Sequence, residues 1–203
     1  MGRIRTHTNP FNYHKKLEPI DFAEMIPVYT GKLQVEIGFG RGVFIRSYAK
    51  DHPETAIVGM DIRKSVAELL QVRLKKEKIE NVGAIHTSGQ RCIEDLFEDD
   101  QIERIFVFHP DPWLKKRHHN RRVLSPEFLK DLRPKLTIGA RLYLTTDVRE
   151  LWDDLSENIL ASGFFKEVEE PEFWDAYYQS HWDTFSKKDG RTISKGVFEL
   201  IDV

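Results

Sequence analysis

From residue 33 onward, short apolar runs alternate with longer segments whose apolar residues recur at helical spacing. A short apolar run between polar residues indicates a buried strand, and a 3.6-residue period indicates an amphipathic helix. We expect strands near 33–37, 56–60, 82–86, 104–108, 140–144, 164–168 and 196–200, and helices near 43–50, 64–78, 94–97, 125–132 and 147–160. This alternation predicts an α/β fold with a doubly wound parallel sheet.

The chain has 203 residues, which suits one well-packed domain. A domain of this size buries roughly 70% of the surface of its unfolded chain. We expect residues 31–203 to form the domain and residues 1–30 to form a basic N-terminal arm. Such an arm is expected to be partly disordered in the free protein and to fold onto a polyanionic substrate.

The overall charge is nearly balanced, with a formal net charge of -2 at pH 7. Binding to nucleic acid would therefore depend on a local basic patch. Cys92 is the one cysteine in the sequence, so neither an internal disulfide nor a thiolate-rich metal site is possible. There is no signal-peptide pattern and no run of the ~20 apolar residues that a membrane helix needs. These features predict a cytoplasmic protein that uses no metal and contacts no membrane.

A glycine-rich turn, EIGFGRG, follows the first predicted strand, with Glu36 before Gly38, Gly40 and Gly42. Glycines permit a tight turn and close approach of a ligand to the backbone. The third glycine comes one residue earlier than in the dinucleotide fingerprint, which disfavours a nicotinamide cofactor. Asp61 ends the second predicted strand, where a carboxylate suits ribose hydroxyls, and that strand holds no cation for a phosphorylated ribose. The set predicts a site for S-adenosylmethionine, with Glu36 facing its cationic part.

A rigid turn and a cation cluster follow the predicted strand 104–108, in the sequence HPDPWLKKRHHNRR. Ligands bind at the carboxyl ends of parallel strands, so this segment lies where chemistry is expected. Pro110 and Pro112 each fix one φ angle and thereby orient Asp111. The candidate phosphate-binding residues are Lys115, Lys116, Arg117, His118, Arg121 and Arg122. The arrangement indicates an enzyme that acts on a nucleic-acid base, while a plain turn with a solvated loop is the simpler interpretation.

Some groups near this turn keep two interpretations each. Trp113 either packs under the turn or stacks on the target base. His118 either contacts phosphate or is an ordinary exposed histidine. Residues 171–185, dense in aromatics, form either a packed capping element or a lid over a flipped-out base. Neither His109 nor His118 shares a helix face with an acid, so a zinc site is not predicted.

Together these motifs resemble the bacterial tRNA (guanine-N7)-methyltransferases over nearly the whole chain, from about residue 33 to residue 200. The most specific element is the Pro-Asp-Pro-Trp turn with its cations, and the segment Thr145-Thr146-Asp147 also fits. The resemblance implies a class I, Rossmann-like methyltransferase with a mostly parallel seven-stranded sheet and helices on both faces. It implies methyl transfer from S-adenosylmethionine, which becomes S-adenosylhomocysteine. The implied acceptor is N7 of a tRNA variable-loop guanine, guanine 46 in the standard tRNA count.

The resemblance also implies roles for single residues. Glu36 and Asp61 would hold the cofactor, and either Ser88 or Gln90 would contact its adenine. Asp111 would lie at the methyl-transfer centre. The tRNA would be contacted by the loop cations and by Asp147, Ser180 and Asp183. The last two fall on a Thr-x-x-Glu motif of the family, which reads Ser-x-x-Asp here.

Other functions remain as alternatives. An inactive tRNA-binding or assembly protein would bind tRNA without the cofactor, and the intact glycine turn with its two acids disfavours it. A methyltransferase with another RNA substrate would share the same motifs. A methyltransferase for small molecules or proteins would need a pocket in place of a cationic loop. The sequence implies no obligatory protein partner, so we expect a monomer or a homodimer.

Overall fold

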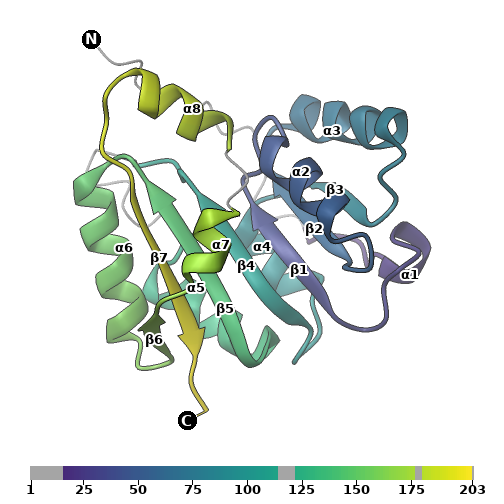
Figure 1. The fold of residues 1–203 in the computed structure, drawn as a ribbon. Helices are drawn as coiled ribbons and strands as arrows, with labels where there is room; N and C mark the ends of the chain where they lie inside the picture. The colour runs from purple at the N-terminus through teal and green to yellow at the C-terminus, as the bar shows by residue number, and fades with distance from the viewer. Residues whose placement is uncertain (1–15, 114–121, 177–179, 203) are drawn as a thin grey trace.

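The computed structural model describes residues 16–113, 122–176 and 180–202. The predicted phosphate-binding residues Lys115, Lys116, Arg117, His118 and Arg121 lie outside these ranges. Within them the chain forms a seven-stranded sheet in the order β3-β2-β1-β4-β5-β7-β6 (Figure 1). The strands are β1 (Leu33–Ile37), β2 (Ile57–Asp61), β3 (Val82–His86), β4 (Ile102–Phe108), β5 (Leu136–Thr146), β6 (Phe165–Val168) and β7 (Ser194–Leu200). β7 runs antiparallel to β5 and β6, and the other pairs are parallel, which confirms the predicted fold class.

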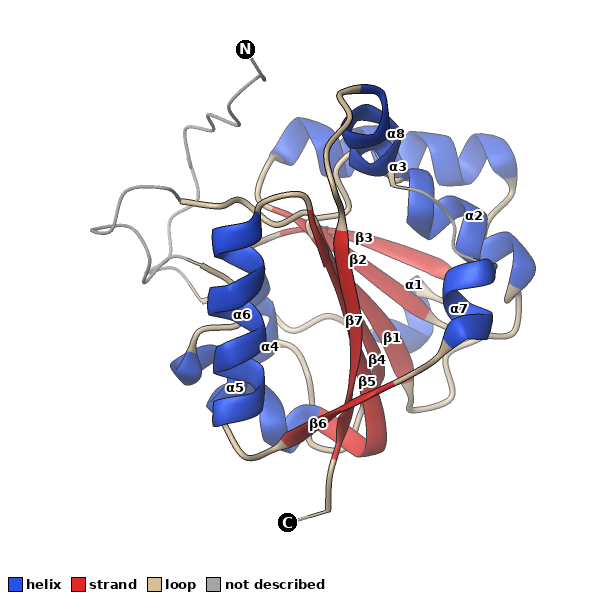
Figure 2. Ribbon diagram, turned by 60° about the vertical axis from the view of Figure 1, so that its left-hand side comes forward, coloured by secondary structure: helices blue, strands red, loops and turns tan. Residues whose placement is uncertain are grey.

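Helices cover both faces of the sheet (Figure 2). They are α1 (Phe22–Met25), α2 (Val43–Asp51), α3 (Lys64–Glu77), α4 (Gly89–Asp95), α5 (Pro126–Leu132), α6 (Arg149–Ala161), α7 (Pro171–Asp175) and α8 (His181–Lys188), with a 3-10 turn at Arg133–Lys135. One apolar core joins the sheet to α1, α4, α5 and α6, and the other joins it to α2, α3 and α7. Strands alternate their side chains between faces, so a sheet buried on both sides needs two cores. In the described part of the chain, no helix has the length and apolar character needed to span a bilayer.

The central strands place the two predicted motifs at one edge. β1 lies between β2 and β4, and Glu36 is level with Phe106 in the neighbouring strand. From β1 the chain adds β2 and then β3 on one side, and it then crosses back to form β4 on the other side of β1. Such a reversal of strand order opens a crevice at the carboxyl ends of the two strands, where ligands bind in open α/β sheets.

Several element boundaries differ from the sequence prediction. The helix expected at 94–97 is α4, which begins at Gly89 because the Ser88 side chain caps it by accepting from the Arg91 amide. β5 begins at Leu136, four residues early, because Leu136 already pairs with Ile102 of β4 ahead of a register shift. Asp147 does not cap α6, since Val148 occupies that N-cap position without a side-chain hydrogen bond.

The N-terminal segment contributes to the packed domain. α1 lies within the range we assign to the basic arm, yet Phe22 and Ile26 are buried in the core with Phe97. The rings of Phe22 and Phe97 are stacked, with centroids 5.5 Å apart. Packing of the described chain therefore begins before residue 31, and residues 1–15 lie outside the described ranges.

Candidate active site

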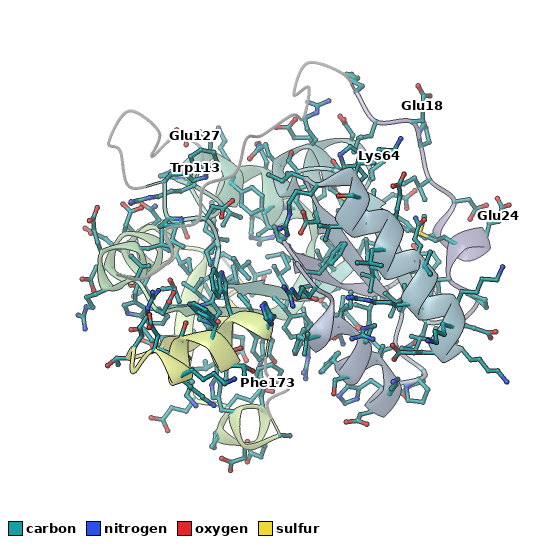
Figure 3. The ribbon with its side chains drawn as sticks, turned by 90° about the horizontal axis from the view of Figure 1, so that it is seen from above. Glu18, Glu24, Lys64, Trp113, Glu127 and Phe173 are labelled. Atoms are coloured by element: carbon teal, nitrogen blue, oxygen red, sulfur yellow. The ribbon has the colours of Figure 1, made fainter. Side chains whose placement is uncertain are left out.

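The candidate site occupies the carboxyl edge of the parallel strands, at the top of Figure 1 and seen from above in Figure 3, where Trp113 is labelled. The glycine turn follows β1, Asp61 ends β2, and the Pro-Asp-Pro turn follows β4. The structure therefore brings the predicted cofactor residues and the predicted catalytic acid to the same edge. Among the described residues, no group of three or more His, Cys, Asp or Glu side chains is placed to hold a metal ion.

The glycine turn needs glycine for two separate reasons. Gly38, Gly40 and Gly42 all have positive φ angles, of 78°, 56° and 64°. Side chains other than glycine rarely adopt this conformation. At Gly42 a Cβ atom would also lie 2.6 Å from the Leu70 Cδ1 atom, which packs beneath the turn. Gly42 is the N-cap of α2, so the turn exposes the positive end of that helix dipole to the site.

Glu36 is a buried acid without full hydrogen bonding. Its residue is only 3% exposed, and its Oε2 atom has no hydrogen-bond partner among the described residues. Burial, followed by the nearby charge of Asp61, raises the pKa of Glu36 from 4.5 to about 8. A cationic ligand would restore the ionised form and use the unpaired oxygen. This carboxyl group therefore fits the positively charged part of S-adenosylmethionine.

Asp61 ties β2 to the glycine turn through its carboxylate. Oδ2 accepts from the Gly40 amide at 3.1 Å and from Arg63 Nη2 at 2.6 Å, while Oδ1 accepts from Arg63 Nε at 2.8 Å. The Arg63 backbone amide also donates to Oδ1, at 3.0 Å. A carboxylate has about four acceptor positions, so this set already fills them. A ribose hydroxyl at Asp61 would replace one of these donors.

The two candidates for the adenine contact lie at the start of α4. Ser88 is buried, and its hydroxyl oxygen accepts from the Arg91 amide at 3.2 Å. The Gln90 amide nitrogen donates to Glu94 at 2.6 Å and to Asp131 at 3.0 Å. The adenine contact of either residue stays a prediction, and Gln90 would have to exchange a surface partner to make it.

Asp111 sits on a strained turn close to the cofactor residues. His109 and Trp113, on either side of Pro110–Pro112, have positive φ angles of 48° and 41°, which non-glycine residues seldom adopt. Hydrogen bonds to Asp61, followed by the charges of Asp61 and Asp111, raise the pKa of Arg63 against the effect of its burial. The Asp111 carboxylate is therefore close enough to affect the Arg63 side chain, which is hydrogen-bonded to Asp61. Strained backbone at such a place is a feature of functional sites.

Arg122 holds the base of the basic loop rather than facing solvent. Its side chain is 3% exposed, its Nε donates to the Pro112 carbonyl at 2.9 Å, and its Nη1 donates to Asp154 on α6 at 2.9 Å. A phosphate cannot reach a guanidinium that is buried in this way. The predicted phosphate contact of Arg122 is therefore not supported by its placement, and the described geometry gives it an anchoring role.

The predicted RNA contacts Asp147 and Asp183 are buried against His109. The His109 Nε2 atom lies 2.9 Å from Asp183 Oδ1, and Nδ1 lies 3.4 Å from Asp147 Oδ1. Asp147 Oδ2 also accepts from Ser186 at 2.8 Å and from Arg191 at 2.9 Å. The side chains of Asp147 and Asp183 are 1% and 2% exposed, so neither faces an RNA in this conformation.

Ser180 and Asp183 form a capping box that starts α8. The Ser180 hydroxyl accepts from the Asp183 amide at 3.2 Å, and the Ser180 amide donates to Asp183 Oδ2 at 2.7 Å. The Ser-x-x-Asp motif therefore satisfies the orphan amides at the start of a helix. Its predicted contact with tRNA remains a prediction.

Sequence reasoning missed Arg63 and His109 as members of the site. The second predicted strand holds no cation, which disfavours a phosphorylated ribose, yet Arg63 follows that strand by two residues and pairs with its terminal acid. His109 was considered only as a metal ligand. Its position directly after β4, at the edge that also holds two predicted acids, is the signal that points to it.

Known proteins are similar to this chain in sequence and in fold. A family model described as "Putative methyltransferase" matches residues 30–199. Solved structures resemble the fold at low identity: the 16S rRNA methyltransferase KamB has a TM-score of 0.62 and 18% identity, covering 92% of this chain and 96% of its own. The [4+2]-cyclase SpnF has a TM-score of 0.59 and 13% identity, covering 90% of this chain and 80% of its own. Since these two proteins differ in chemistry, such likeness shows the fold alone.

Curated relatives are closer in sequence. The tRNA (guanine-N(7)-)-methyltransferase of Anopheles gambiae is 32% identical over 184 residues, which are 84% of this chain and 78% of the relative. That of Marinobacter nauticus is 31% identical over 173 residues, 83% of this chain and 71% of the relative. That of Aquifex aeolicus is 38% identical over 144 residues, and the match spans 71% of this chain but about half, 48%, of the relative. The chain therefore belongs to the tRNA (guanine-N7)-methyltransferase family.

Proposed function

We propose that this chain transfers a methyl group from S-adenosylmethionine to N7 of a guanine in the tRNA variable loop. The observation that carries the proposal is the meeting of a buried, incompletely bonded Glu36 with Asp61 and the Asp111 turn at one edge of the sheet. The printed names of the curated relatives supply the reaction class, tRNA guanine-N7 methylation. The inferred setting is the cytoplasm, with tRNA as the partner.

The residues at the edge fit the cofactor. When bound, S-adenosylmethionine supplies an electrophilic methyl group on a sulfonium ion. Glu36 would face the cationic part, Asp61 would accept from the ribose, and the glycine turn leaves backbone exposed for close approach. Ser88 or Gln90 would hold the adenine from the start of α4.

The reaction depends on the orientation of its two reactants more than on a general base. Guanine N7 carries an in-plane lone pair outside the π system, so it attacks without first losing a proton. Good alignment of two bound reactants contributes roughly 7–11 kcal/mol to lowering a barrier. We assign Asp111 the task of accepting hydrogen bonds from the donors on the Watson–Crick edge of guanine. Its charge also offsets the positive charge that the purine gains on alkylation.

The test uses two unmodified tRNA transcripts and methyl-labelled S-adenosylmethionine. One transcript keeps the variable-loop guanine and the other carries adenine in its place. We expect label on the first transcript only, with aniline cleavage at the modified base in the variable loop. Label on both transcripts would indicate another RNA site. Cofactor binding without label on either transcript would contradict the proposal, and tRNA binding without cofactor binding would favour the inactive binding protein.

A further inference from the structure

α8 is held to the domain by polar contacts. Its buried residues are Asp183 and Ser186, whereas Trp182 and Phe185 on the same helix are only half-buried. A surface helix usually buries an apolar stripe against the core. Because hydrogen bonds are directional while apolar contacts are not, the placement of α8 depends on a few defined atoms.

His109 is at the centre of these contacts. Its fully buried ring lies between Asp183 of α8 and Asp147, which follows β5, at 2.9 and 3.4 Å. A carboxylate only accepts, so both ring nitrogens donate when the imidazole carries two protons. Arg191 supplies a cation, 2.9 Å from Asp147, so a guanidinium and the imidazole ring face two buried carboxylates. Charges buried in this way are tolerated when they are paired and hydrogen-bonded.

The same residue is joined to the catalytic turn. The His109 amide donates to the Thr145 carbonyl of β5 at 2.8 Å, and the chain reaches Asp111 two residues later. In the same first turn of α8 as Asp183, burial and then the charge of Arg41, a residue of the glycine turn, lower the pKa of His181. Both ribbon views show α8 above the carboxyl ends of the parallel strands (Figures 1 and 2). The first turn of α8 thus lies near both the glycine turn and the end of β4.

We propose that His109 is a positioning residue that, through Asp147 and Asp183, fixes α8 over the edge where Asp111 and the cofactor residues meet. This inference rests on the proposed function for its catalytic consequence. Without the ring, the two buried carboxylates would lose the hydrogen-bonding group that lies between them, and α8 would move away from the edge.

The test compares full-length wild type with His109→Phe and His109→Gln, and with His52→Phe as a matched control at the far end of α2. We expect faster amide exchange across α8 in His109→Phe, by at least tenfold, with exchange in α6 unchanged. Turnover of tRNA should fall at least 30-fold while the dissociation constant for S-adenosylmethionine changes less than threefold. His109→Gln, which keeps one donor, should recover part of both effects.

A double variant tests whether His109 acts by positioning α8 or only by offsetting the charge of Asp183. His109→Phe with Asp183→Asn removes the facing charge, so its thermal midpoint should return toward wild type while turnover stays low. Unchanged α8 exchange in His109→Phe, or recovery of turnover along with the midpoint in the double variant, would overturn the inference. If wild type itself fails to methylate tRNA, the proposed function fails, and the exchange experiment still decides whether His109 holds α8.

Discussion

Single carboxyl groups in this protein have very different surroundings. Glu36 is buried with a pKa raised to about 8, whereas Asp61 is buried but bonded on all sides by Arg63 and the Gly40 amide. Burial disfavours a charge unless donors or cations replace the lost water. The two carboxyl groups therefore suit different tasks. Glu36 has an oxygen atom without a hydrogen-bond partner among the described residues, and Asp61 has none.

The proton on Glu36 links stability to pH in the ligand-free protein. The folded-state pKa is raised from 4.5 to about 8, so its stabilising contribution is complete below pH 4.5 and is lost as pH rises through about 8. Between pH 5 and pH 8.5, urea unfolding should show wild type losing stability relative to Glu36→Gln, on the order of a few kcal/mol. The exposed Asp99→Asn variant serves as the control and should follow wild type. Parallel pH curves for wild type and Glu36→Gln would contradict the assignment.

The same proton should be released when a cation binds. Because S-adenosylmethionine favours the ionised Glu36, binding at pH 7 should release up to about one proton, and affinity should rise between pH 6 and pH 8. Calorimetry in two buffers with different ionisation enthalpies measures this number directly. In Glu36→Gln the release should disappear together with much of the affinity. Equal heats in the two buffers for wild type would show that Glu36 does not meet the cation.

Asp111 should matter for turnover more than for binding. Asp111→Asn keeps the size of the side chain but replaces one acceptor oxygen with a donor and removes the charge. We expect turnover to fall by about 10²-fold, as for loss of one preorganised electrostatic contact, with tRNA affinity nearly unchanged. Single-turnover methylation and a filter-binding assay measure the two quantities. Normal turnover would exclude the role that we assign to Asp111.

At the scale of elements, the loop after β4 is held by contacts at both of its ends. Arg122 joins the Pro112 carbonyl to Asp154 of α6, so it fixes the base of the turn that carries Asp111. Arg122→Met should lower the free energy of unfolding by about 1–3 kcal/mol, because a buried carbonyl loses its donor. Urea denaturation measures this change. Arg149→Met is the control, since Arg149 lies on α6 like Asp154 but its side chain is 81% exposed, and it should change stability by less than about 0.5 kcal/mol.

Local signals in the sequence predicted most elements, and contacts between distant segments were the part they could not show. The strands at 33–37 and 82–86 match β1 and β3, because β1 alternates apolar with polar residues and β3 is a short run of small and apolar residues ending at His86. The glycine turn was recognisable because its residues are adjacent. His109 and Asp183 are 74 positions apart, and their contact depends on the path of the chain through α6, β6 and α7. The burial of the Arg122 and Asp147 side chains likewise depends on partners far along the chain, Asp154 and Ser186 among them.

At the scale of the whole molecule, the total charge is nearly balanced, but the predicted phosphate-binding cations are concentrated in one segment. The formal net charge is -2, while four of the predicted phosphate-binding cations fall within 115–121. Counterion release should give a slope of about -3 for log affinity against log salt from these four. Lys116→Ala should reduce the slope by about one and weaken all tRNAs alike, whereas Lys32→Ala, at the opposite edge of the sheet, should not. Titrations at several salt concentrations measure both slopes, and a selective loss for one tRNA would indicate base reading.

The position of β7 between β5 and β6 also determines when the sheet can be completed during synthesis. β7 is translated after every other strand of the sheet, yet it lies between β5 and β6 and pairs with both. A nascent chain that has emerged only through α6 would already carry Glu36, Asp61 and Asp111, while α8 and Arg191 would still be inside the ribosome. The residues that we propose to bind the reactants are thus made before α8, which lies above them. We therefore expect a growing chain to gain methyl-transfer activity only after α8 and β7 have emerged.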